Sequence, residues 1–218
     1  MKNETTLVLI RHGETEWNKT GRYQGHADSP LTPRGMAQAR AVAQVLEGET
    51  FDAFYSSDLG RAKHTATIIA DKLGRRFLTD SRLREQHYGL MQGHDGKAAR
   101  ELDPGFFESL AHGDADYAPK GGESRRQRHQ RAITALSDIA EQHSGGLALI
   151  ITHGGIVDSL FRETLGIPFE SPRRYSLYNT AVNRFSFCDG SWTLRLWGEI
   201  SHLSAAGATD AGKSFTAA

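Results

Sequence analysis

The stretch Thr6-Leu7-Val8-Leu9-Ile10-Arg11-His12-Gly13 sets an arginine and a histidine directly behind a short apolar run. The run at 6–10 is rich in branched side chains and does not alternate between apolar and polar residues, which predicts a strand buried on both faces. Such strands belong to parallel sheets with helices on both sides. In open sheets of this kind, ligands bind beyond the carboxyl ends of the strands, which is where Arg11 and His12 stand.

Helix and strand patterns alternate along the rest of the chain. A helix is predicted from Pro33 onward, and the next helix has Asp58 as its predicted N-cap. Strands are predicted at 51–55, 76–78 and 147–151, helices at 123–143 and from Gly154-Gly155, and a hairpin at 181–188 and 192–199 around Asp189-Gly190. This order predicts an α/β three-layer sandwich, in which helices cover both faces of a mostly parallel sheet with an antiparallel edge strand.

The chain length and composition limit the function classes. The 218 residues point to a single domain at 1–204, with a lid-like insertion at 86–122 and a flexible C-terminal tail at 205–218. The 26 basic and 26 acidic residues cancel, so no overall field favours nucleic acid or a membrane surface as partner. The single cysteine, Cys188, excludes an internal disulfide and, with no signal segment, favours a cytoplasmic location. The late hairpin offers an edge through which a homodimer can form.

Three segments place basic side chains at the predicted carboxyl ends of strands. Arg11 and His12 follow the first strand, Arg61 lies just past the second, and His153 follows the strand at 147–151. If these strands are neighbours, two arginines and two histidines converge beside helix N-termini, which suits a dianionic phosphoryl group. Each segment alone also fits a solvated loop, a turn or a surface ion-pair partner. Their joint occurrence favours the anion pocket.

Four separated motifs carry a family resemblance. They are Arg11-His12-Gly13-Glu14-Thr15, Arg61 in Ser56-Ser57-Asp58-Leu59-Gly60-Arg61-Ala62, Glu85 in Leu83-Arg84-Glu85, and Thr152-His153-Gly154. In this order they resemble the histidine phosphatase superfamily, and within it the phosphoglycerate mutase-like branch with its broad-specificity phosphatases. The resemblance covers residues 6 to about 203, nearly the whole chain.

The resemblance implies a role for each matching residue. His12 would be the nucleophile that forms a phosphohistidine, and Glu85 the general acid and then the base. Arg11, Arg61 and His153 would bind the phosphoryl oxygens. The implied further substrate contacts are Thr15, Asn18, Tyr23, Gln24 and Gly154. The implied partner is a small phosphorylated metabolite, and no cofactor is implied.

Elementary chemistry agrees with these roles. A nucleophilic histidine must be neutral, and nearby Arg11 and Arg61 disfavour its protonation. The same arginines supply the positive charge, so no metal is needed, and we find no carboxylates and histidines at metal-ligand spacing. An alkoxide is a poor leaving group and requires an acid, which a buried Glu85 beside the phosphate can supply. The alternative for Glu85 is an ion pair with Arg82 or Arg84 on a loop.

The sequence leaves three functions open. The segment between Glu85 and His153 looks shorter than in the glycolytic mutases, which favours a phosphatase. The stretch Arg22-Tyr23-Gln24-Gly25, followed by Asp28-Ser29-Pro30-Leu31-Thr32, resembles broad-specificity phosphatases and favours the same function. The stretch His87-Tyr88-Gly89-Leu90-Met91-Gln92-Gly93 instead looks like a phosphoglycerate mutase, since phosphatase relatives often carry Trp-Glu in place of Met91-Gln92. A non-catalytic phospho-ligand binder is the remote alternative. The cluster Arg125-Arg126-Gln127-Arg128 is interpreted as a solvated helix face, with an anion-steering rim as its alternative.

Overall fold

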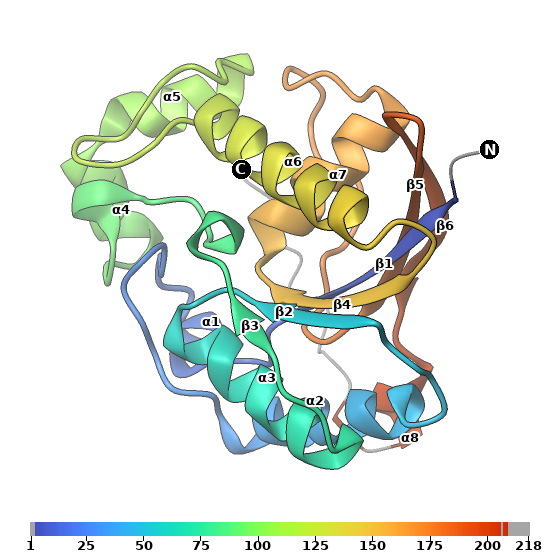
Figure 1. The fold of residues 1–218 in the computed structure, drawn as a ribbon. Helices are drawn as coiled ribbons and strands as arrows, with labels where there is room; N and C mark the ends of the chain where they lie inside the picture. Colours follow the sequence, from blue (N-terminus) through green and yellow to red (C-terminus); the bar gives the residue numbers. More distant parts are fainter. Residues whose placement is uncertain (1–2, 206, 209–218) are drawn as a thin grey trace.

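Figure 1 shows the fold in a computed structural model, which describes residues 3–205 and 207–208. These residues contain a six-stranded sheet with the strand order β3-β2-β4-β1-β5-β6. The strands are β1 (Thr5–Arg11), β2 (Ala53–Ser56), β3 (Leu78–Thr79), β4 (Leu147–Thr152), β5 (Val182–Cys188) and β6 (Ser191–Glu199). The pairs β3–β2, β2–β4 and β4–β1 are parallel, whereas β5 and β6 form an antiparallel hairpin at the edge. The predicted fold class is confirmed.

The sheet is the middle layer of three. Helices cover both of its faces, so β1 is buried on both sides as its sequence predicts. Leu7 and Leu9 pack on the side of α6 (Arg125–Gln142) and α7 (Gly154–Leu165). Val8 and Ile10 pack on the opposite side, against α2 (Pro33–Leu46) and α3 (Gly60–Leu73). Figure 1 shows the two helix pairs on opposite faces of the sheet. All four side chains are fully buried, and each contributes about 1.5–3 kcal/mol to folding.

The N-terminus of α3 corrects one expectation. Asp58 does not cap this helix: the N-cap is Leu59, which makes no side-chain hydrogen bond. The Asp58 carboxylate instead accepts from Arg84 Nε at 2.7 Å. Asp28, from a loop 33 residues upstream, accepts the helix N–H of Arg61 at 3.2 Å. Asp28, which is distant in the sequence, thus binds the helix N-terminus that Asp58 was predicted to cap.

Residues 86–122 build a small layer of their own beside the sheet. They hold a 3₁₀ turn (Gly89–Met91) and the helices α4 (Gly96–Leu102) and α5 (Pro104–His112). Met91, Ala99 and Phe106 form a separate apolar cluster, against which Tyr23 and Tyr88 pack. That this insertion acts as a lid stays a prediction.

The remaining elements are short. A five-residue helix, α1 (Glu16–Thr20), forms between β1 and α2, where no helix was predicted. A 3₁₀ turn (Ser81–Leu83) and α8 (Ser201–Ala205) complete the description. The predicted tail lies mostly outside the described residues; within them, Ala208 is buried and donates its N–H to Leu203 O at 2.9 Å. No helix in the described part of the chain is long and apolar enough to cross a membrane.

Candidate active site

The carboxyl ends of three adjacent strands meet at one edge of the sheet. Arg11 is the last residue of β1 and pairs with Thr152, the last of β4, so His12 and His153 emerge side by side. Strand β2 lies on the other side of β4, and Arg61 follows it in the first turn of α3. The ring centroids of His12 and His153 are 5.1 Å apart. The three strands that carry these basic side chains are therefore neighbours in the sheet.

The hydrogen bonds of His12 define its protonation state. Arg61 Nε lies 3.2 Å from His12 Nε2, and an arginine nitrogen can only donate. His12 Nε2 therefore carries a lone pair. The proton sits on Nδ1, which donates to the Gly13 carbonyl at 2.8 Å. The ring is 3 % exposed, so this neutral tautomer is held in a buried position.

The surroundings of both histidines favour their neutral forms. Burial holds the pKa of His12 well below its usual value near 6.5, and the charges of Arg61 and Arg11 lower it further. The pKa of His153 is likewise lowered by burial, then by Arg61, His12 and Arg11. Both rings are therefore uncharged at neutral pH.

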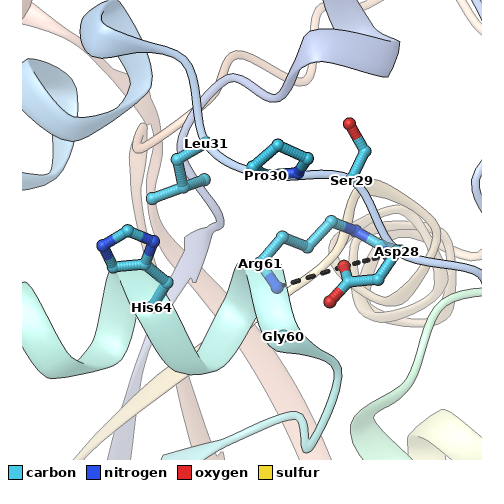
Figure 2. A pocket seen from close by; sticks show the side chains of 7 residues that line it. All are labelled: Asp28, Ser29, Pro30, Leu31, Gly60, Arg61 and His64. Carbon is cyan, nitrogen blue, oxygen red and sulfur yellow. Dashed lines mark hydrogen bonds and ion pairs between the residues drawn. The ribbon is translucent and has the colours of Figure 1, made fainter.

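Backbone carbonyls and one carboxylate hold the guanidinium of Arg61. Its Nη1 donates to Ala27 O at 2.9 Å and to Asp28 Oδ1 at 3.2 Å, and its Nη2 donates to Gly25 O at 2.7 Å. Figure 2 shows this contact between Asp28 and Arg61, which both line a surface pocket of about 320 Å³. Residues 28–31 and Gly60, Arg61 and His64 line that pocket, but His12, His153 and Glu85 do not. Asp28 thus holds the arginine from the side away from His12.

His153 and Arg11 complete the cluster at the strand ends. His153 Nε2 lies 2.8 Å from Ser57 Oγ, while its buried Nδ1 makes no hydrogen bond to the described residues. Arg11 Nη1 donates to the Leu177 carbonyl. A Cβ on Gly154 would lie 3.6 Å from Arg11 Nε, which places the arginine beside the first turn of α7.

Glu85 reaches the same place from outside the sheet. Its Oε2 accepts from the N–H of Gly155 at 2.9 Å, and its Oε1 accepts from the N–H of Gln86 at 2.8 Å. A Cβ on Gly155 would overlap Oε1 of Glu85, so only glycine allows this close approach. The carboxylate therefore lies at the N-terminus of α7, next to His153.

The other predicted site residues lie in different settings. Thr15 and Asn18 form a reciprocal capping box at the start of α1. Gln24 is 7 % exposed, and its Oε1 makes no hydrogen bond to the described residues. Tyr23 packs edge-on against Tyr88, with ring centroids 5.1 Å apart, in the aromatic cluster of the insertion. The structure thus brings Arg11, His12, Arg61, Glu85, His153 and Gly154 together, with Gln24 next to the Gly25 carbonyl that binds Arg61.

Comparisons with known proteins identify the family of this chain. Residues 7–200 match the family model of the histidine phosphatase superfamily, branch 1. The chain belongs to the histidine phosphatase superfamily. It is 40% identical over 211 residues to phosphoglycerate mutase-like protein 4 of Arabidopsis thaliana, covering 94% of this chain and 90% of that one.

Solved structures of similar proteins share the fold. YhfR of Bacillus stearothermophilus has a TM-score of 0.85 at 36% identity, covering 91% of this chain and 99% of that one. A phosphoserine phosphatase of Entamoeba histolytica, in complex with phosphoserine, has a TM-score of 0.82 at 30% identity, over 91% of this chain and 99% of that one. This member of the superfamily therefore resembles both phosphatases and mutase-like proteins.

Four supporting residues of this histidine phosphatase superfamily member escape sequence reasoning. Asn179 Nδ2 donates to the His12 carbonyl at 2.7 Å, and Thr65 Oγ1 accepts from the Gly13 N–H at 3.1 Å. Ser57 and Asp28 hold His153 and Arg61 as described above. Ser57 and Asp28 stand in motifs of the family resemblance, around Arg61 and at 28–32, whereas Asn179 and Thr65 had no signal in the sequence. In the described part of the chain, no three His, Cys, Asp or Glu side chains gather in a way that could hold a metal ion.

The predicted helix face at 125–128 is wrong for one of its residues. Arg128 is 6 % exposed, since it packs between α6 and α7. Its Nη1 donates to Gln86 Oε1 at 3.2 Å, and its Nη2 lies 3.4 Å from Asp158 Oδ2. Gln127 is exposed as predicted, Arg125 and Arg126 are partly exposed, and Arg128 is buried.

Proposed function

We propose that this chain hydrolyses small phosphate monoesters through a phosphohistidine on Nε2 of His12, without a metal ion. The observation that carries the proposal is the buried, neutral His12, whose Nε2 lone pair faces a permanently charged arginine. A neutral imidazole beside a cationic anion-binding group is what phosphoryl transfer to nitrogen requires.

The proposed reaction has two steps. Nε2 of His12 attacks phosphorus, the N–P bond forms and the P–O ester bond breaks, while protonated Glu85 gives its proton to the leaving alkoxide. Ionised Glu85 then takes a proton from water as the water attacks the phosphohistidine, which breaks the N–P bond and releases phosphate. Arg11 and Arg61 stabilise charge on the phosphoryl oxygens. The buried Nδ1 of His153 has no hydrogen bond to the described residues, so it can bind a phosphoryl oxygen together with these two arginines.

A phosphoglycerate mutase is the second candidate. The stretch 87–93 and the name of the Arabidopsis thaliana relative favour it. The phosphatase reading is supported by the Arg22-Tyr23-Gln24-Gly25 motif and by the similar structure of a phosphoserine phosphatase. In a mutase the phosphoryl group of His12 returns to a sugar-acid hydroxyl, whereas in a phosphatase it passes to water.

The first test replaces the nucleophile. We expect His12→Ala to lower nitrophenyl phosphate hydrolysis by about 10⁴-fold or more, because the covalent route is lost. An acid-labile, base-stable phosphate label should form on the wild-type chain and vanish in the variant. His64→Ala, which alters an exposed histidine on α3, is the matched control and should keep both signals. Equal rates for His12→Ala and wild type would remove His12 from the nucleophile role.

A second test separates hydrolysis from transfer and from metal use. Phosphate release from a panel of phosphomonoesters should proceed without bisphosphoglycerate and should survive a metal chelator. Strict dependence on bisphosphoglycerate, with phosphate only moved between hydroxyls, would contradict the phosphatase assignment. Loss of activity with the chelator and its return with a metal would contradict metal independence.

A cytoplasmic location and a homodimer through the late hairpin stay predictions.

A further inference from the structure

Glu85 lies on a segment without regular secondary structure. Residues 84–88 belong to no helix or strand and link the two 3₁₀ turns. The backbone carbonyls of such a partly buried segment need hydrogen-bond partners from elsewhere in the protein. Without a helix or sheet ladder, those partners also decide where the Glu85 side chain points.

One arginine of α6 binds two carbonyls of this segment and one of the 3₁₀ turn that precedes it. Arg131 Nη1 donates to Arg82 O at 2.7 Å and to Arg84 O at 2.8 Å. Its Nη2 lies 3.3 Å from the carbonyl of Glu85 itself. The planar guanidinium has donors in a rigid fork, so it fixes the relative positions of all three oxygens. A lysine, with a single nitrogen, would not hold this arrangement.

Glu123 fixes Arg131 in turn and joins it to the far end of the segment. Arg131 Nε donates to Glu123 Oε2 at 3.3 Å, and Nη2 contacts Oε1. The same Oε1 accepts the N–H of His87 at 3.0 Å, and the Glu123 N–H donates to His87 O at 2.9 Å. The two side chains are 22% and 18% exposed, which marks a half-buried pair rather than a surface one.

We propose that Arg131, held by Glu123, is a positioning residue for Glu85: it aims the carboxyl group that serves as general acid and base. The inference rests on the proposed role of Glu85. Arg131 contacts the backbone of the acid-bearing segment, whereas the carboxylate itself is held by Gly155 and Gln86. Removing Arg131 therefore leaves Glu85 present but poorly aimed.

The test uses the leaving group as a reporter of acid catalysis. A dinitrophenolate departs without a proton, whereas the alkoxide of an alkyl phosphate needs one. For Arg131→Gln we expect kcat/KM for glycerol phosphate to fall by about 10²-fold, while that for dinitrophenyl phosphate stays within about threefold of wild type. An equal loss on both substrates would reduce Arg131 to a general structural role and overturn the proposal, as would no loss on either.

Three variants make the result decisive. Glu85→Gln should show the same selective loss; if it does not, the acid role of Glu85 fails whatever Arg131 does. If Glu85→Gln is selective and Arg131→Gln is not, only the positioning inference fails. Arg126→Gln is the matched control, because this arginine of α6 pairs with exposed Asp116 at 2.7 Å and does not contact the segment. Should Arg131→Gln fail to fold, Glu123→Gln replaces it and must show the selective loss.

Discussion

At the scale of single residues, the chemistry depends on the difference between arginine and histidine. Arginine keeps its proton in proteins, so Arg61 Nε can only donate and His12 Nε2 can only accept. The nucleophile is therefore set in its reactive tautomer before any substrate arrives. This arrangement requires two buried histidines, His12 and His153, to stay uncharged in the folded protein, which lowers its stability at acidic pH.

This requirement predicts a pH dependence of stability. In the unfolded chain a histidine binds a proton below about pH 6.5, whereas burial lowers the pKa of folded His12 and His153 well below that value. The unfolded state therefore binds more protons as the pH falls. The free energy of unfolding should decrease below about pH 6.5 by about 1.4 kcal/mol per pH unit for each histidine, and this effect should be absent above it.

Urea unfolding at about pH 7 and about pH 5 checks this expectation. His153→Gln should reduce the slope of the unfolding free energy against pH by the contribution of one histidine, about 1.4 kcal/mol per pH unit. Burial also lowers the pKa of His26, His129 and His202, so part of the slope should persist in the variant. A slope unchanged by His153→Gln would show that His153 is protonated in the folded protein.

At the scale of elements, α3 depends on a partner from outside the helix. Asp28 Oδ1 accepts both the N–H and the Nη1 of Arg61, so one carboxylate caps the helix and holds its functional side chain. Gly60 allows this, because a Cβ there would overlap Asp28 Oδ2. Figure 2 shows the carboxylate and the guanidinium facing each other. Stability and activity are thus coupled at this position.

We predict that Asp28→Ala lowers both the stability of the protein and its activity. The free energy of unfolding should fall by about 1 kcal/mol through the lost cap. The kcat/KM for nitrophenyl phosphate should fall by about tenfold or more, because Arg61 is no longer held beside His12. Glu49→Ala removes a carboxylate that pairs with Arg184 at 2.8 Å away from the site, and should leave kcat/KM unchanged. Full activity in Asp28→Ala would contradict the holding role.

At the scale of the whole molecule, the insertion has its own apolar core. Met91, Ala99 and Phe106 form a cluster separate from the two clusters that sandwich the sheet. Its cohesion is local: the buried carboxylate of Asp103 accepts from Phe106 N at 3.1 Å and from the Tyr117 hydroxyl at 2.6 Å. Segments with separate cores can open without global unfolding.

Hydrogen exchange should reveal that independence. Phe106→Ala removes a side chain that is 3 % exposed and should weaken the insertion by about 3–5 kcal/mol. We expect faster exchange across α4 and α5, with β1 and β4 still protected. Phe185→Ala, in the main core, should instead accelerate exchange throughout the chain. Uniform acceleration in Phe106→Ala would show that the insertion and the sheet unfold together.

Much of the fold and part of the site were predictable because their signals are local. The unbroken apolar run of β1 predicted burial on both faces, and the carboxyl ends of parallel strands share one edge, so Arg11, His12 and His153 were expected to meet. Boundaries were less accurate: the strand predicted at 51–55 is Ala53–Ser56. The five-residue α1 was missed although Thr15 and Gly21 cap its two ends, because five residues are too few to show a helical periodicity.

The sequence by itself determined the layer order, the strand ends that carry the basic side chains, and the family. Periodicity and spacing are enough for these, because each depends on residues close together in the chain. Only the tertiary structure decided that Asp28 rather than Asp58 caps α3, that Arg128 is buried, and that Arg131 holds the segment of Glu85. These contacts join residues 30 or more positions apart, and hydrogen-bond geometry over such separations leaves no pattern in the sequence.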